Sequence, residues 1–169
     1  KSFAFPVIQL GGTTTLTYLI QNQSGLTAEE ISFVDDLSPG IVVAPTPNIQ
    51  SSCDPALVTA VAGSQEVSLT SGSLQPGETC VISIDVVGVA SGNNASISSS
   101  ITSSFPGGNP GASGFSCAVL EVIDPGDLAS LTLAKSFPNG PIAPGAEGIL
   151  RFTLTNNSRT QTFTDIAFT

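Results

Sequence analysis

The sequence predicts an all-β protein, an immunoglobulin-like antiparallel β-sandwich, on three observations. Apolar and polar residues alternate with a period of two over short runs, which is the pattern of half-buried strands. Turn signals such as SPG at 38–40 and DPGD at 124–127 separate these runs at short intervals. No stretch shows the apolar stripe of an amphipathic helix. Many short strands at this spacing favour a sandwich of two sheets.

The alternation identifies the strands and their inward faces in order along the chain. In residues 13–22 the side chains of Leu16, Tyr18 and Ile20 share one face, which we expect to be buried. The other expected strands are 66–70 with Val67 and Leu69 inward, 79–88 with Cys80, Ile82, Ile84 and Val86 inward, 95–102 with Ile97 and Ile101 opposite Ser96, Ser98 and Ser100, and 116–124. Residues 103–114, rich in Gly, Pro and Ser, are expected to form a long loop.

The beginning of the chain recurs near its end. Lys1, Ser2 and Phe3 are repeated as residues 135–137, and the same offset of 134 residues holds further on. It aligns Ile8 with Ile142, Gly11 with Gly145, Leu16 with Leu150, Asn22 with Asn156, and Ser24 with Ser158. Matching core positions in one register within one chain predict a tandem repeat.

The repeat predicts two units of unequal length. Residues 1–128 would form an immunoglobulin-like repeat that lacks its first strand, and residues 129–169 would form the N-terminal part of a second, incomplete copy. The stretch 129–134 is expected to be a strand leading into the second copy, and it has no counterpart before Lys1. The segment is then either part of a longer array, or it is completed by a strand from a neighbouring molecule.

Composition excludes several classes of function. The net charge is -9, with 13 acidic residues against 4 basic ones, so no basic patch exists to neutralise nucleic-acid phosphates. Histidine is absent, which removes the commonest general base and a common metal ligand. No constellation of catalytic residues stands out, and we expect no enzymatic activity and no cofactor apart from a calcium ion. No apolar run reaches the length of a membrane span.

The three cysteines have different settings. Cys80 lies on the inward face of its expected strand and Cys53 lies in a connection rich in Pro and Ser, so a disulfide between them is expected, with buried free thiols as the alternative. By the loop-length relation such a bridge removes about 3–4 kcal/mol of unfolded-state entropy. Cys117 shares a face with Glu121, and it is expected to be a free thiol or half of an intermolecular bridge.

A regular strand over 131–137 would place Lys135, and by the repeat also Lys1, on an apolar face. Stacked immunoglobulin-like domains sometimes condense such a lysine with an Asn or Asp side chain, beside a catalytic carboxylate, to form an isopeptide bond. In this chain Asp35 or Asp36 would serve as the acid and Asn94 or Asn22 as the acceptor. A bulge that turns the lysine out to solvent is the simpler alternative.

The sequence also contains candidate residues for calcium binding and for N-glycosylation. Asp124 and Asp127, at the junction between the copies, supply oxygen ligands of the kind that calcium takes, although solvated turn residues are the plainer interpretation. The triplets beginning at Asn22, Asn94 and Asn156 fit the N-glycosylation pattern. Asn22 and Asn156 are repeat equivalents, which favours structural turn residues over acceptors.

Several motifs together resemble a known family of surface domains. They are the KSF triplet, the turn and strand LGGTTTLTYLIQN, the stretch ISFVDDLSPGIVVA, the cysteine in SSCDP, and LQPGETCVISIDV. The set resembles the bacterial and archaeal cell-surface conserved-repeat family of immunoglobulin-like domains. The resemblance implies an extracellular structural repeat of a stalk, sheath or filament, with neighbouring repeats or identical subunits as partners. An adhesin-type module that recognises a glycan or a protein through its loops is the alternative.

Overall fold

In the computed structural model the chain divides into two compact units, Lys1–Ile123 and Asp124–Thr169. The structure describes residues 1–112, 114–125, 131–158 and 162–167. Unit 1 contains two β-sheets and unit 2 contains a two-stranded sheet. Among the described residues no helix is long and apolar enough to cross a membrane. The predicted domain boundary between 128 and 129 falls within residues 126–130, outside the described residues.

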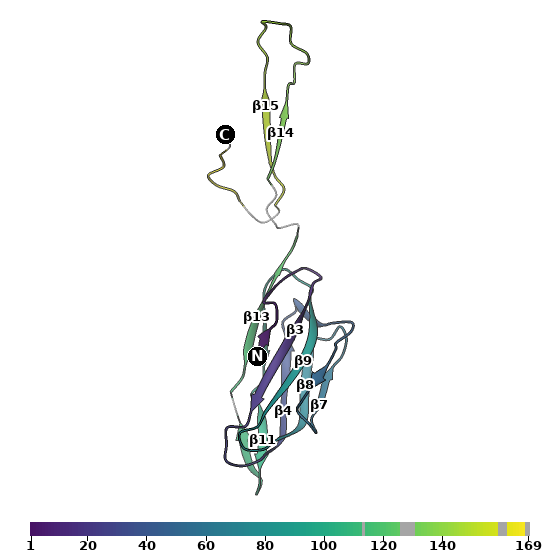
Figure 1. Cartoon of the computed structure of the whole chain (residues 1–169), viewed down its shortest axis with the longest axis vertical. Coiled ribbons are helices and arrows are strands. Elements are labelled where there is room, and N and C mark those ends of the chain that lie inside the picture. Colours follow the sequence, from purple (N-terminus) through teal and green to yellow (C-terminus); the bar gives the residue numbers. More distant parts are fainter. Residues whose placement is uncertain (113, 126–130, 159–161, 168–169) are drawn as a thin grey trace. The chain divides into compact units, whose positions relative to one another are not determined.

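Unit 1 is an immunoglobulin-like β-sandwich, as predicted (Figure 1). The first sheet is built around β3 and β9, which pair antiparallel along the whole of β3, from Thr13↔Val87 to Gln21↔Thr79. Its strands are β1 (Ser2–Phe3), β3 (Thr13–Gln21), β5 (Ile41–Val43), β6 (Gln50–Ser51) and β9 (Thr79–Gly88).

The second sheet is larger and is centred on β4, which pairs with three neighbours. Its strands are β2 (Val7–Gln9), β4 (Ala28–Leu37), β7 (Leu57–Ala60), β8 (Glu66–Leu74), β10 (Gly92–Ser98), β11 (Thr102–Phe105), β12 (Asn109–Ala112) and β13 (Cys117–Ile123). The pairing of β2 with β13 is parallel, in contrast to the antiparallel arrangement that the sequence predicts. The expected loop at 103–114 is wrong in part, because β11 and β12 form an antiparallel hairpin there.

The inward faces of the two sheets form one hydrophobic core. The predicted inward residues of β3, Leu16, Tyr18 and Ile20, are buried in it. The predicted inward residues of β8 and β9 are buried there as well: Val67, Leu69, Cys80, Ile82, Ile84 and Val86. Period-two alternation therefore identifies the buried face wherever that face is apolar.

On β10 the alternation is inverted. Ser96 is 0% exposed and Ser98 is buried, whereas Ile97 is 51% exposed. The reason is a polar cluster in the core, described below, that requires the Ser96 hydroxyl. An apolar residue at this position would take one hydrogen-bond partner away from both the Lys1 ammonium and the Asp35 carboxylate.

Unit 2 consists of β14 (Leu131–Ser136) paired with β15 (Arg151–Asn156). The pairing is antiparallel, from Leu131↔Asn156 to Ser136↔Arg151. Both strands are exposed along their whole length, apolar side chains included. Residues 131–134 of the predicted strand 129–134 thus lie in β14, and residues 129 and 130 lie outside the described residues.

Candidate functional site

Four polar side chains from both sheets meet inside unit 1, and we call them the Lys1 cluster: Lys1, Tyr18, Asp35 and Ser96. Lys1 Nζ lies 3.0 and 2.9 Å from the two carboxylate oxygens of Asp35. The same Nζ donates to Ser96 Oγ at 2.9 Å, and Ser96 Oγ donates to Asp35 Oδ2 at 2.9 Å. The Tyr18 hydroxyl donates a short hydrogen bond to the same carboxylate oxygen. The Asp35 carboxylate is therefore fully engaged by three neighbours.

Strand alternation places this carboxylate in the core. On β4 the inward positions are occupied by Phe33, Asp35 and Leu37, and Asp35 is 0% exposed. On β3 the phenol ring of Tyr18 packs against Phe33, with ring centroids 5.2 Å apart. Lys1 Nζ lies 5.6 Å from the centroid of the Tyr18 ring, so the ring face adds a cation–π contact to the ion pair.

Burial sets the electrostatics of the cluster. The pKa of Lys1 is lowered by desolvation, which outweighs the opposing effect of Asp35. The pKa of Tyr18 is raised, first by desolvation and then by the Asp35 charge and hydrogen bond, which disfavour the phenolate. An ion pair removed from water in this way is stable only because every polar atom has a partner. Among the described residues no buried side-chain nitrogen or oxygen lacks one.

The raised pKa of Tyr18 predicts how the protein behaves in alkali. In the unfolded chain the phenol ionises near pH 10, whereas in the folded chain it stays protonated well above this pH. The folded state then holds one more proton, so this group's contribution to stability is full below pH 10 and falls as the pH rises further. Because Tyr18 is the single tyrosine, tyrosinate absorbance reports it alone. We expect the absorbance to rise in one step together with loss of β-sheet circular dichroism, and a titration near pH 10 in the folded protein would contradict this.

The cluster excludes one of the two alternatives for Lys1, the bulge that turns its side chain to solvent. Its side chain is buried and paired with Asp35, so the interpretation in which a bulge turns it to solvent is wrong for this residue. The repeat-equivalent Lys135 is exposed, with its Nζ 6.0 Å from the ring centroid of Phe152. Asp36, the other candidate acid, points outward from β4 and is exposed.

Both candidate isopeptide acceptors are engaged elsewhere. The Asn22 carboxamide is buried and donates to the carbonyl oxygens of Leu26 and Leu74. The Asn94 carboxamide donates to the carbonyl oxygens of Ala90 and Gly92. The side chain beside Lys1 and Asp35 is that of Ser96, which has no carboxamide group to condense with the lysine amine. A condensation of Lys1 with Asn22 or Asn94 therefore has no acceptor beside the amine.

The side-chain contacts of Asn22 and Asn156 also bear on the role of the glycosylation triplets. The side-chain oxygen of Asn22 accepts from the backbone N–H and the hydroxyl of Ser24, so Asn22 holds the turn that ends β3. Asn156 accepts in the same way from the backbone N–H of Ser158 at 2.8 Å. Both contacts are those of a turn residue, although glycosylation at Asn22, Asn94 and Asn156 stays a prediction.

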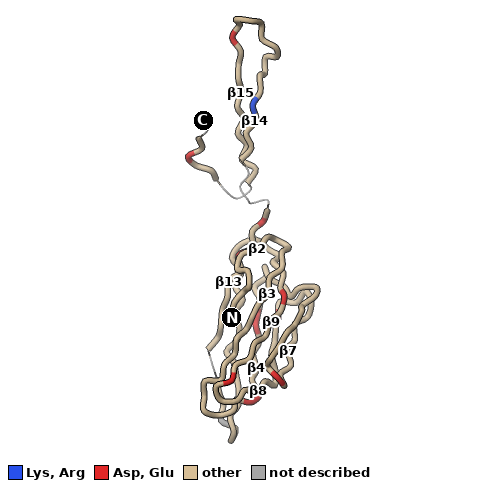
Figure 2. The backbone as a smooth tube through the Cα atoms, viewed as in Figure 1, with Lys and Arg blue, Asp and Glu red and all other residues tan. Residues whose placement is uncertain are grey.

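The described residues offer little support for the calcium site predicted at Asp124 and Asp127. Asp127 lies outside the described residues, and among those described no group of three or more Asp, Glu, Cys or His side chains could hold a metal ion. Along the backbone of each unit the Asp and Glu residues lie at several separate places (Figure 2). Calcium binding at Asp124 and Asp127 stays a prediction.

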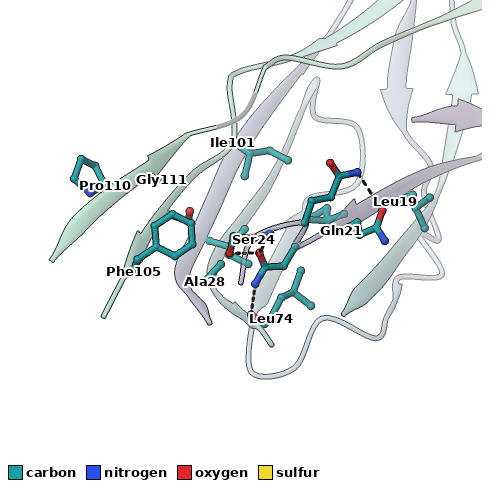
Figure 3. Close-up of a pocket in the computed structure, with 14 residues that line it drawn as sticks. Leu19, Gln21, Ser24, Ala28, Leu74, Ile101, Phe105, Pro110 and Gly111 are labelled. Carbon is teal, nitrogen blue, oxygen red and sulfur yellow. Dashed lines mark hydrogen bonds between the residues drawn. The ribbon is translucent and has the colours of Figure 1, made fainter. Parts of the chain in front are cut away.

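A groove of about 750 Å³ opens next to the Lys1 cluster, and we call it the edge groove. One side is the end of β3, with Leu19 and Gln21, and the other side is the β11–β12 hairpin, with Phe105 and Gly111 (Figure 3). Its floor is formed by side chains that are buried or half-buried in the core: Ile20, Ala28, Ile31, Leu74 and Ile101. No residue that lines the groove is charged. The groove therefore suits an uncharged occupant that carries both apolar and hydrogen-bonding groups.

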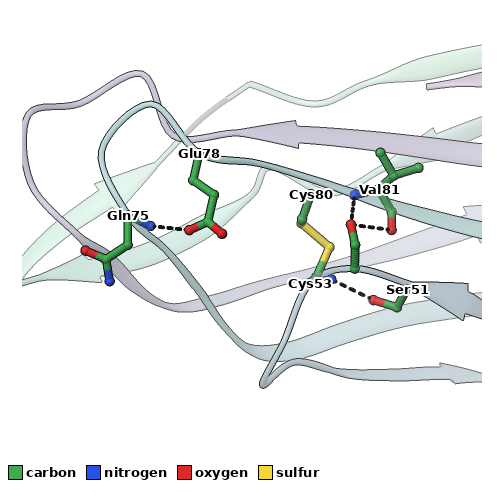
Figure 4. The surroundings of a disulfide bond; sticks show 7 residues. Ser51, Cys53, Gln75, Glu78, Cys80 and Val81 are labelled. Carbon is green, nitrogen blue, oxygen red and sulfur yellow. Dashed lines mark hydrogen bonds between the residues drawn. A yellow bond between two sulfur atoms is a disulfide. The ribbon is translucent and has the colours of Figure 1, made fainter.

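Cys53 and Cys80 form a disulfide, as the sequence predicts (Figure 4). Ser52 on the connection pairs with Val81 on β9: the Ser52 backbone N–H donates to the Val81 carbonyl oxygen, and the Val81 N–H donates to the Ser52 hydroxyl oxygen. The bridge thus fixes the connection before β7 against the first sheet. Cys117 is an exposed free thiol at the start of β13.

Two parts of the site lie beyond what the sequence predicted. Tyr18 and Ser96 were expected only as members of strand faces, and the edge groove was not expected at all. Alternation does contain one signal, because Asp35 falls in the inward series Ile31, Phe33, Asp35 and Leu37. A carboxylate in such a series predicts a buried cationic partner, which Lys1 supplies.

Comparison with known proteins places the fold and the family. A cohesin module from a Clostridium perfringens family 33 glycoside hydrolase is similar in structure, with a TM-score of 0.54 and 11% identity over 72% of this chain and 94% of that one. The collagen-binding subdomain of the Enterococcus faecalis surface protein ACE has a TM-score of 0.47 and 11% identity, over 68% and 93%. A Nocardia farcinica protein with an immunoglobulin-like fold has a TM-score of 0.39 and 16% identity, over 71% and 96%.

A comparison with curated proteins found no match. The family assignment rests instead on a sequence model that covers nearly the whole sandwich. Residues 1–122 match it, and the chain belongs to the family described as "Domain of unknown function (DUF7933)".

Proposed function

We propose that the chain is a structural repeat module of an extracellular surface protein that forms a stalk, sheath or filament. The observation that carries this proposal is the pairing register of the two units. In unit 1, β1 pairs with β3 as Ser2↔Thr17. In unit 2, β14 pairs with β15 as Ser136↔Arg151, which is the same pair displaced by 134 residues. The sequence repeat is thus matched by a repeat of backbone pairing.

Three further details support a tandem repeat. Gly11 and Gly145 both have positive φ angles, 79° and 84°, at the turn before the paired strand. The lysines Lys1 and Lys135 lie over the equivalent rings Tyr18 and Phe152. The turn after the strand uses the same contact in both copies, from Ser24 N–H to Asn22 and from Ser158 N–H to Asn156. Unrelated segments would not be expected to share all three of these local features.

The setting outside the cell is supported by the disulfide, since such bonds persist in oxidising compartments. Two lysines and two arginines in the whole chain leave few sites for proteases that cleave after basic residues. The motifs that resemble those of the bacterial and archaeal conserved-repeat family support the same role. In such an array the module supplies length and stiffness, and its partners are neighbouring repeats or identical subunits in a fibre.

A binding role is the second candidate, because the segment between β12 and β13 presents an aromatic side chain to solvent. Phe115 is 68% exposed, and exposed aromatic rings serve to stack on sugars or to anchor protein ligands. On this alternative the chain is an adhesin-type module whose ligand is a glycan or a protein.

Negative-stain electron microscopy of the protein on its native cells tests the proposal. We expect beaded fibres whose regular spacing corresponds to one immunoglobulin-like module. Isolated globular particles, together with binding of the purified chain to a glycan array or to an extracellular-matrix protein, would support the adhesin alternative and overturn the structural role.

A further inference from the structure

The last part of β3 has an open hydrogen-bonding edge. Ala4 N–H donates to the Thr15 carbonyl oxygen on the β1 side, and Asn22 N–H donates to the Glu78 carbonyl oxygen on the β9 side. The odd-numbered residues of β3 therefore direct their peptide groups toward β1. Pairing with β1 ends at Thr17, and in the part of the chain that the structure describes no strand continues it along Leu19 and Gln21. The edge groove lies beside this open edge.

In unit 2 the equivalent edge is covered. β14 pairs with β15 beyond the Ser136↔Arg151 pair, as Ala134↔Thr153, Leu133↔Leu154, Thr132↔Thr155 and Leu131↔Asn156. Displaced by 134 residues, the four partners on β15 are Leu19, Ile20, Gln21 and Asn22 of β3. These four residues all line the edge groove. One copy thus shows the strand that the other copy's groove would accept.

The side-chain pattern of this strand fits the groove. Directly opposite residues of an antiparallel pair point to the same face. A leucine in the place of Leu133 would lie opposite Ile20 and one in the place of Leu131 opposite Asn22, both of which are buried. The threonine between them would lie opposite Gln21, which is exposed. The same alternation next places a lysine opposite Tyr18, which is where Lys1 lies.

We propose that the edge groove is an acceptor site for one added β-strand, a segment with the sequence of residues 131–134 that runs into β1 without a break. The occupant would extend the existing β1–β3 ladder, exchanging backbone hydrogen bonds with Leu19 and Gln21 and placing two leucines on the groove floor. Leu-Thr-Leu-Ala is uncharged, as is the lining of the groove. This inference rests on the repeat equivalence used for the proposed function, and it deepens that function because a strand shared at each junction would stiffen an array.

The test adds the segment Ala-Ser-Leu-Thr-Leu-Ala, the sequence of residues 129–134, directly before Lys1 of the whole chain. We expect the melting temperature of unit 1 to rise by ~5 °C or more, because two leucine side chains leave water on folding. We also expect the amides of Leu19 and Gln21 to exchange ~10-fold or more slowly with solvent deuterium, because their N–H groups gain partners.

Two controls separate strand addition from a general effect of a longer chain. An extension of the same length with both leucines replaced by asparagine should leave the melting temperature unchanged. Leu19→Pro removes an N–H from the open edge only, so it should be tolerated in the unextended chain and should abolish the gain in the extended one.

The inference would be overturned if the extended chain had the same melting temperature as the unextended one and the amides of Leu19 and Gln21 were not protected from exchange. Protection of these amides in the unextended chain that increases with protein concentration would overturn it too, because the occupant would then be the edge of a second copy. The imaging test of the proposed function does not depend on either result. Beaded fibres together with an inert extension would refute the acceptor site alone.

Discussion

Replacing Asp35 with alanine is expected to lower the free energy of unfolding by about 3–5 kcal/mol, the range for removing one partner of a buried ion pair. The carboxylate is 0% exposed and takes hydrogen bonds from Lys1, Tyr18 and Ser96. Without it the Lys1 ammonium stays in the core with no counter-charge, and two hydroxyl groups lose their acceptor. Chemical denaturation followed by circular dichroism, with the disulfide intact, measures the change.

Asp36→Ala is the matched control. It removes the same charge one residue further along β4, where the side chain is exposed, and it should change the stability by no more than about 0.5 kcal/mol. A double variant, Lys1→Met with Asp35→Leu, should recover much of the loss, since apolar replacement of a whole buried pair is often neutral. Equal effects of Asp35→Ala and Asp36→Ala would contradict the buried pair. An intact mass short by one water would show that Lys1 and Asp35 are joined by an amide bond instead.

The strands of the core were predictable because their inward faces are apolar. Alternation over residues 13–22 and 79–88 gave the predicted inward residues of β3 and β9 correctly, and these two strands pair along the whole of β3. The sandwich class follows from the same evidence, since several half-buried strands between frequent turns can bury their apolar faces only against a second sheet.

The faces and pairings that depend on polar contacts between distant residues were not predictable in the same way. β10 buries Ser96 because its hydroxyl donates to the Asp35 carboxylate, 61 positions away in sequence. Hydropathy alone predicts that Ile97 is the buried residue. The β11–β12 hairpin was hidden by its Gly and Pro content, and it forms because β4 offers an edge to β11, as in the pair Thr102↔Ser32. The parallel pairing of β2 with β13 likewise depends on the finished sheet.

The candidate site was predicted in part. Alternation placed Lys135, and by the repeat Lys1, on an apolar face, with a solvent-facing bulge as the simpler alternative; Lys1 is buried beside Asp35, one of the two acids considered, whereas Lys135 is exposed. The two asparagines proposed as acceptors are held by backbone carbonyl oxygens instead: Asn94, within β10, donates to Ala90 and Gly92. In the structure Asn22 fastens the β3 turn to Leu26 and Leu74, a role that only tertiary contacts show.

Removing the disulfide is the second large effect expected. The variant with Cys53→Ala and Cys80→Ala should lose about 3–4 kcal/mol of stability, the value for a loop closed over a sequence separation of 27. That loop contains β7 and β8, which belong to the second sheet, whereas Cys80 lies on β9 of the first. Without the bridge the unfolded chain gains the conformational freedom of this whole loop. In the folded chain the hydrogen bonds between Ser52 and Val81 alone must then hold the connection against β9.

Cys117→Ser is the control, because the Cys117 thiol is exposed and outside the core, and its effect should stay within about 0.5 kcal/mol. Thiol titration of the denatured, unreduced protein should find one reactive group among the three cysteines. Three reactive thiols, or a double variant as stable as Cys117→Ser, would contradict the bridge. Reduction of the native protein should reproduce the loss seen in the double variant, and it should do so in Cys117→Ser as well, since the stabilisation comes from the loop between Cys53 and Cys80 and not from the exposed thiol.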